Sequence, residues 1–116
     1  MPKPKFFFGT YYSDYDLTIL ENRIVMGLGN AYTSKAPTFS PDKYKGKFSM
    51  IGIKKDGAAF TDTQQLFTVD EATGKVSVAA NTMLRAGAYE VTVQTQATTG
   101  LVLTATFTLV MEPIDG

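Results

Sequence analysis

The side chains with the most binding chemistry to offer are aromatic rings that crowd the start of the chain. Between residues 5 and 15 the sequence carries Phe6, Phe7, Phe8, Tyr11, Tyr12 and Tyr15. A tyrosine ring gives a ligand a large, flat contact area at a small cost in conformational entropy. Two interpretations stay open: alternate rings enter a core while the others shield a strand edge, or some tyrosines form a stacking platform for a sugar ring or a protein partner.

Three further rings, Tyr32, Phe39 and Tyr44, interrupt a polar, loop-like stretch at residues 29–44. They either cover a core as lids or belong to a binding surface. If a sugar binds, its ring should stack on an exposed tyrosine while amide or carboxylate groups accept its hydroxyl protons. The candidate ligand-binding residues are Tyr12, Tyr15, Tyr32 and Tyr44.

Acidic and basic residues each form one short pattern. Asp14 and Asp16 could start a turn or ligate calcium, but calcium takes about six to eight oxygen ligands, so a turn is favoured and no metal is expected. Lys43, Lys45 and Lys47 would share one face of a strand. They form either a phosphate-binding stripe or a solvated strand edge guarded by lysines, and the edge is favoured because a phosphate stripe calls for a net positive domain.

The residue inventory argues against most enzyme chemistry. The chain has no His and no Cys, which removes the common acid–base relays, cysteine nucleophiles and disulfides. No Gly-rich phosphate loop or nucleophile elbow is present, and a glycosidase with two carboxylates is the formal alternative. We therefore expect a protein that is not an enzyme and binds no cofactor. With 11 basic and 11 acidic residues, no nucleic-acid partner is expected either.

Length and hydropathy indicate one domain. A chain of 116 residues can bury roughly 65% of its unfolded surface, enough for a core without disulfides. Its apolar runs are broken by threonine and fall short of the ~18 residues of a membrane span, so no membrane insertion is expected. We expect a single domain at residues 1–112, followed by a linker at residues 113–116 to a further module.

The clearest structural signal is a hairpin at residues 66–78, around which the other strands are arranged. Phe67 and Val69 alternate with polar residues on one arm, and Val76 and Val78 do so on the other. Asp70 can start the turn, and Gly74 can take the positive φ of a hairpin loop.

Further strands are predicted on both sides of this hairpin. Residues 5–15 form a first strand broken at Gly9, and residues 17–28 form a strand, a turn and a second strand, with a single helical turn as the alternative. An edge strand is expected at residues 36–39. A strand is also expected at residues 48–53. Its apolar residues change from even to odd positions partway along, which indicates a bulge or burial on both faces. Residues 88–96 and 101–111 are long strands, the second with Leu101, Leu103, Ala105, Phe107 and Leu109 inward.

These segments predict an all-β fold: an immunoglobulin-like antiparallel Greek-key β-sandwich of about seven strands. Its core should contain the residues on the inward parity of adjacent strands. These are Phe67, Val69, Val76, Val78, Leu84, Tyr89, Val91, Val93, Leu103 and Phe107.

Residues 67–78, Leu84 and residues 87–93 together resemble the latter half of a cadherin-like repeat, in which a strand ends in Asp, a Thr-Gly turn follows, and a tyrosine-containing strand packs beside the last strand. Calcium-binding members carry an acidic residue after the leucine and an Asp-x-Asp at the end of the tyrosine strand. This chain has Arg85 after Leu84, and Gln94 to Gln96 at the second place, so the resemblance predicts calcium independence.

The front half carries Ala36-Pro37, then residues 46–50, and is followed by the Thr-Gly hairpin. With these segments it is similar to immunoglobulin-like or cadherin-like modules of secreted surface lipoproteins in gut Bacteroidetes. That resemblance implies an extracellular location on the outer cell surface. It also implies a non-catalytic module of a larger protein that acts as a structural or adhesion spacer, or alternatively a carbohydrate-binding module. The expected partners are a polysaccharide or another domain of the same protein.

Overall fold

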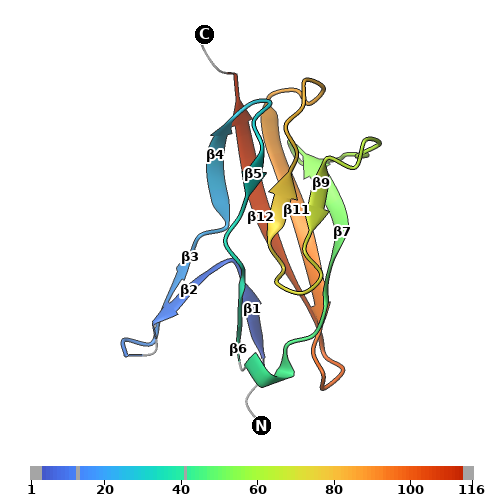
Figure 1. Cartoon of the computed structure of the whole chain (residues 1–116). Helices are drawn as coiled ribbons and strands as arrows, with labels where there is room; N and C mark the ends of the chain where they lie inside the picture. Colours follow the sequence, from blue (N-terminus) through green and yellow to red (C-terminus); the bar gives the residue numbers. More distant parts are fainter. Residues whose placement is uncertain (1–3, 13, 41, 114–116) are drawn as a thin grey trace.

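The chain folds as a β-sandwich, seen here in a computed structural model that describes residues 4–12, 14–40 and 42–113 (Figure 1). The predicted all-β class is therefore confirmed. Within the described residues, the one helical element is a 3-10 turn, η1 (Asp42–Tyr44). No helix among them has the length and hydropathy needed to cross a membrane.

Twelve strands, several of only two or three residues, connect through short turns and loops in the described part of the chain. In chain order they are β1 (Lys5–Phe7), β2 (Gly9–Tyr12), β3 (Leu17–Leu20), β4 (Arg23–Gly27), β5 (Tyr32–Thr33), β6 (Thr38–Ser40), β7 (Phe48–Lys55), β8 (Ala58–Ala59), β9 (Phe67–Val69), β10 (Val76–Val78), β11 (Gly87–Gln96) and β12 (Val102–Glu112). This is more than the seven expected, because the front half of the chain is cut into short segments that pair in different places.

One layer is a five-stranded sheet in the order β4-β12-β11-β7-β8. Its centre is the antiparallel pairing of β11 with β12, which runs from Gly87↔Met111 to Gln96↔Val102. The pairing of β4 with β12 is parallel, so the sheet is mixed rather than purely antiparallel. Between β7 and β11 the register shifts around Ile51, which is exposed, and the predicted bulge is confirmed.

The opposite layer is a three-stranded sheet in the order β5-β10-β9, joined lower down by the pair β1-β6 (Figure 1). The chain crosses from the large sheet to the small one after β8 and returns after β10. A core of aromatic and branched side chains fills the space between the layers. Its buried members include Phe6, Phe8, Phe39, Phe48, Phe67, Val76, Val78, Tyr89, Val91, Val93, Phe107 and Leu109.

The predicted central hairpin is present as β9 and β10, with Val76 opposite Val69 and Val78 opposite Phe67. The carboxylate of Asp70 accepts hydrogen bonds from the backbone N–H of Ala72 (2.8 Å) and of Thr73 (2.9 Å). These bonds hold the pKa of Asp70 below its usual 3.8. Gly74 takes a φ of 79°, and a Cβ there would lie 2.8 Å from Pro37, so the turn needs glycine for two reasons.

The predicted core is largely confirmed. Eight of its members are buried, namely Phe67, Val76, Val78, Leu84, Tyr89, Val91, Val93 and Phe107. Val69 and Leu103 are only partly buried and pack against that cluster. Leu101, expected inward, is exposed because it lies in the turn before β12.

The interpretation of Lys43, Lys45 and Lys47 as one face of a strand is wrong. Lys43 belongs to η1, and β7 begins only at Phe48, so the three ammonium groups lie outside any strand. Lys45 pairs with Asp42 at 3.6 Å and Lys47 with Glu71 at 3.0 Å, while Lys43 lies 5.0 Å from the ring centre of Tyr44. The helical turn forms because the N–H of Lys45 bonds the carbonyl of Asp42, which the alternation of charged residues could not reveal.

Replacing Phe107 by alanine should destabilise the protein by about 3 to 5 kcal/mol, since this buried ring contacts Phe8 and Tyr32 and its loss leaves a cavity. Urea unfolding measures the change. Val102→Ala on the same strand is the matched control, because Val102 is exposed and should change stability by less than about 0.5 kcal/mol. Equal unfolding midpoints for the two variants would contradict the packing described.

Candidate functional site

The four tyrosines singled out from the sequence lie on three different elements. Tyr12 and Tyr15 belong to the arm formed by β2, β3 and their turn, and both are exposed. Tyr32 lies in β5 and is half-buried. Tyr44 lies in η1, where its carbonyl accepts a hydrogen bond from the N–H of Thr98. The structure therefore brings Tyr12 near Tyr15 but does not gather all four on one surface.

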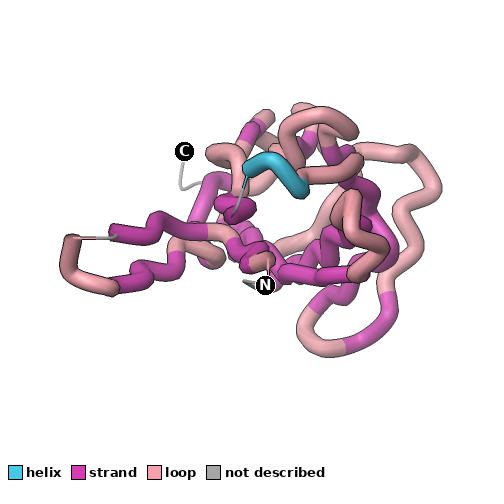
Figure 2. Tube along the Cα trace, turned by 90° about the horizontal axis from the view of Figure 1, so that it is seen from below, coloured by secondary structure: helices cyan, strands magenta, loops and turns pink. Residues whose placement is uncertain are grey.

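The arm projects sideways from the sandwich and, within residues 4–12, 14–40 and 42–113, pairs with no other strand (Figures 1 and 2). Its register sets Tyr12 opposite Leu17 and Thr10 opposite Ile19, so these side chains share one face. Every residue of β3 is exposed, although Leu17, Ile19 and Leu20 are apolar and keep 47%, 43% and 58% of their surface in solvent. A strand of this composition would ordinarily have one face buried.

The turn at the tip of the arm confirms the interpretation of Asp14 and Asp16 as turn residues, with Asp16 at a φ of 48°. The hydroxyl of Tyr11 donates a 2.7 Å hydrogen bond to Asp16, which raises the pKa of that phenol above 10.0. Lys5 lies 5.0 Å from the centre of the same ring. Among the described residues, no three acidic side chains come together in a group that could hold a metal ion.

A pocket of about 210 Å³ lies where the arm joins the sandwich. Its aromatic wall contains Tyr32, Phe8 and Phe107: the Tyr32 ring stacks on Phe107 at 6.4 Å and 20°, and Phe8 meets Phe107 edge-on at 5.1 Å. Burial raises the pKa of the Tyr32 phenol above its usual 10.0. This wall is anchored to the core, because Phe8 and Phe107 are both buried.

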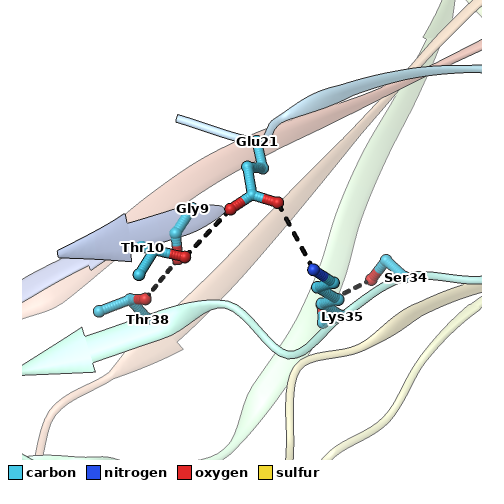
Figure 3. Close-up of polar contacts among 6 residues, drawn as sticks. All are labelled: Gly9, Thr10, Glu21, Ser34, Lys35 and Thr38. Atoms are coloured by element: carbon cyan, nitrogen blue, oxygen red, sulfur yellow. Dashed lines mark hydrogen bonds and ion pairs between the residues drawn. The ribbon is translucent and has the colours of Figure 1, made fainter. Parts of the chain in front are cut away.

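Polar side chains of Thr10, Glu21 and Lys35 also line the pocket, and Figure 3 shows the contacts among them. Glu21 accepts a 3.0 Å hydrogen bond from the hydroxyl of Thr10 and forms an ion pair with Lys35 at 3.8 Å. Lys35 is the more exposed partner, so its ammonium group can turn toward a ligand at little cost. One carboxylate, one ammonium and one hydroxyl thus border an aromatic surface. This combination can accept and donate hydrogen bonds to a polyhydroxylated molecule whose flat face packs on a ring.

The elements that hold this pocket are fixed by close backbone contacts. The hydroxyl of Thr38 donates a 2.6 Å hydrogen bond to the carbonyl of Gly9, which ties β6 to the root of the arm (Figure 3). A Cβ at Gly9 would collide with the carbonyl of Ile19, so the arm can leave the sandwich here only with glycine. Ser34 is buried and accepts the N–H of Val76 at 2.9 Å, which positions Lys35 beside it.

Sequence reasoning found Tyr32 but missed Thr10, Glu21 and Lys35. These residues are 11 and 14 positions apart along the chain, and only the folding of the arm against the β5–β6 connection brings them together. A second pocket, of about 250 Å³, was also missed: it lies between residues 60–66 and residues 83–85, over the ring of Tyr89. No local motif marks either pocket.

Comparison with known proteins does not assign this chain to a family. No protein-family model matches the chain, and a search of curated proteins gives no significant match.

Replacing Tyr32 by phenylalanine should make the unfolding free energy fall less steeply as the pH rises into the alkaline range. The folded-state pKa of Tyr32 is raised, so its contribution is complete below the unfolded pKa of about 10 and is lost as the pH rises through the folded pKa. The unfolding free energy should therefore fall more steeply for the parent than for the variant between about pH 9 and 11. Urea unfolding at a series of pH values measures this, with pH 7 as the reference. Equal slopes would contradict the raised pKa of the partly buried Tyr32 phenol.

Proposed function

We propose that this protein is a non-catalytic, extracellular module of a larger cell-surface protein and acts as a structural or adhesion spacer. The observation that carries the proposal is the placement of the first and last strands. The body is elongated, with extents of 51 × 30 × 23 Å, and β1 and the end of β12 lie at opposite ends of it (Figure 1). A module of this kind in a tandem chain separates its neighbours by its own length.

The parallel pairing of β4 with β12 suits a spacer that must resist tension. The paired segment runs from Arg23↔Thr108 to Gly27↔Glu112. Once β1 and the arm have been pulled away, tension enters at the start of β4, leaves at the end of β12 and pulls the two strands along each other in opposite directions. The ladder bonds are then loaded together rather than opened one at a time, so the pair resists more force than a strand peeled from its end.

The location and the class of organism are supported by the sequence alone. Residues 67–78, Leu84 and residues 87–93 resemble the latter half of a cadherin-like repeat, and the front half resembles modules of Bacteroidetes surface lipoproteins. The lack of His and Cys agrees with a non-catalytic role. We place the module on the outer cell surface on these grounds, with another domain of the same protein as its neighbour. The expected linker at residues 113–116 lies, from 114 on, outside the described residues.

Single-molecule pulling tests the spacer. A chain with this module between marker domains should show one clear unfolding event per module, releasing about 300 Å as residues 23–112 extend. Met26→Pro should lower the unfolding force, because the ladder alternation directs the Met26 N–H toward β12, as the bonds from Thr108 to Asn22 and from Leu28 to Glu112 show.

Two controls isolate the ladder bond. Met26→Ala removes the same side chain but keeps the N–H, and Val25→Pro places proline where the N–H faces away from β12. Both should unfold at forces above that of Met26→Pro. Extension of the parent without a distinct event would count against a spacer under tension.

A carbohydrate-binding role is the second candidate, favoured by the pocket at the base of the arm. Tyr32 supplies an aromatic wall there, and Glu21 and Lys35 supply hydrogen-bonding charges at the rim. The ligand would be a polysaccharide whose chain continues along the exposed face of Tyr12 on the arm. The spacer role does not require this site.

Isothermal titration calorimetry with a panel of plant and host polysaccharides tests the second role. Binding should be lost in Tyr32→Ala and weakened at least tenfold in Glu21→Gln, since a missing charge-assisted hydrogen bond costs about 1.5 to 3 kcal/mol. Tyr44→Ala is the matched control, because Tyr44 lies in η1 and does not line this pocket. Loss of binding in Tyr44→Ala alone would move the site to η1. Absence of heat with every polysaccharide would contradict the glycan role, and turnover of a glycan would contradict both roles.

A further inference from the structure

The free edge of β3 is the largest unexplained feature of the surface. Among the residues that the structure describes, β3 pairs with β2 alone, and its sequence, Leu17–Leu20, contains no charge and no proline. Natural sheets usually protect an exposed edge with lysine, proline or a bulge, because unpaired N–H and C=O groups on an apolar strand attract another strand. Together with Tyr12, the apolar side chains of β3 give the arm an exposed apolar surface. The arm itself projects away from the sandwich (Figure 2).

The backbone direction along β3 follows from one hydrogen bond. The N–H of Glu21 bonds the carbonyl of Phe8 at 2.9 Å, so Glu21 points its backbone groups toward β2. Because an antiparallel ladder alternates, Leu17 and Ile19 do the same, and Thr18 and Leu20 point their N–H and C=O groups to the free edge. A pairing strand must therefore meet β3 at Thr18 and Leu20.

We propose that β3 pairs in antiparallel fashion with β3 of a second copy of this chain, about a two-fold axis at Thr18. Thr18 then lies opposite its own counterpart, and the outward-pointing backbone groups of both copies bond each other. In this register Leu17 lies opposite Ile19 of the other copy, so the apolar faces of the two arms join on the same side of a four-stranded sheet. A strand that pairs with itself across a two-fold axis satisfies both edges at once.

Charge complementarity favours a second copy. The tip of the arm carries Asp14 and Asp16, whereas at its root Glu21 is paired with Lys35 and Arg23 adds one further positive charge. Antiparallel pairing points the acidic tip of each arm toward the root of the other, where Arg23 begins β4. A parallel arrangement would set the two acidic tips together, which like charges disfavour.

The contact is small, which sets the strength of the expected association. The half-exposed side chains of one arm offer on the order of 400 Å², about half of what each partner contributes to a standard interface. The dimer should therefore dissociate in the micromolar range or above. This inference concerns the arm alone and does not depend on the spacer or the glycan proposal.

Sedimentation velocity of the intact chain, from about ten micromolar to about one millimolar, tests the association. The sedimentation coefficient should rise with concentration for the parent and stay at the monomer value for Ile19→Lys. That variant should keep the melting temperature of the parent, since Ile19 is outside the buried core. A parent that stays monomeric throughout would overturn the proposal in favour of a different partner for the arm. Association that persists in Ile19→Lys would overturn it in favour of another surface.

A disulfide test checks the register. The natural chain has no cysteine, so Thr18→Cys introduces a single thiol. Opposed residues of a hydrogen-bonded antiparallel pair lie about 5.5 Å apart at Cα, within the span of a disulfide. Mild oxidation should convert Thr18→Cys to a covalent dimer at least tenfold faster than Thr104→Cys, whose threonine on β12 is also exposed. Equal rates would overturn the proposed axis.

Discussion

The pairing of β12 with its two neighbours is the interaction on which the rest of the structure depends. β12 is bonded along its length to β11 on one side and at its end to β4 on the other. Its inward residues, Phe107, Leu109 and Met111, form the side of the core that belongs to the large sheet. The small sheet packs over these side chains. Phe8, near the start of the chain, joins the same core through its contact with Phe107. Because the contacts of β1, β4, β5 and β11 converge here, an error in the register of β12 would displace both layers.

Much of this architecture could be predicted from local signals. The hairpin of β9 and β10 is specified by Asp70 and Gly74, and the alternation of residues in β11 identifies its buried face without any knowledge of its neighbours. What could not be predicted depends on distant parts of the chain. The parallel partner of β12 comes from a strand some 85 positions earlier, and no turn links the two. The segment after Ser40 was mispredicted for a local reason. Alternating lysines do not show which side of a strand is buried, and one backbone hydrogen bond forms a helical turn there instead.

The same limit applies to the candidate site. Aromatic composition identified Tyr32 as a candidate, but it gave equal weight to Tyr44, which the structure places in a different element. The pocket acquires its polar wall only when Glu21, which ends the arm, folds over Lys35 in the β5–β6 connection. Polar groups that are this far apart along the chain form no short sequence pattern from which their contact could be predicted. Composition therefore indicates that a chain has binding residues, and the fold decides which of them act together.

The aromatic segment at the start of the chain combines two opposite roles, and Gly9 is where they divide. Before it, Phe6 and Phe8 are buried and fix β1 in the core. After it, the chain leaves the sandwich as a two-stranded hairpin, a form that is marginal in water when it stands alone. The arm is held at its root by the bonds of Thr38 to Gly9 and of Glu21 to Phe8. Since the arm adds little to the core, its apolar side chains lower the free energy of the protein only when something covers them. A hairpin anchored at one end and unprotected along its edge is thus better suited to recognition than to the stability of its own domain.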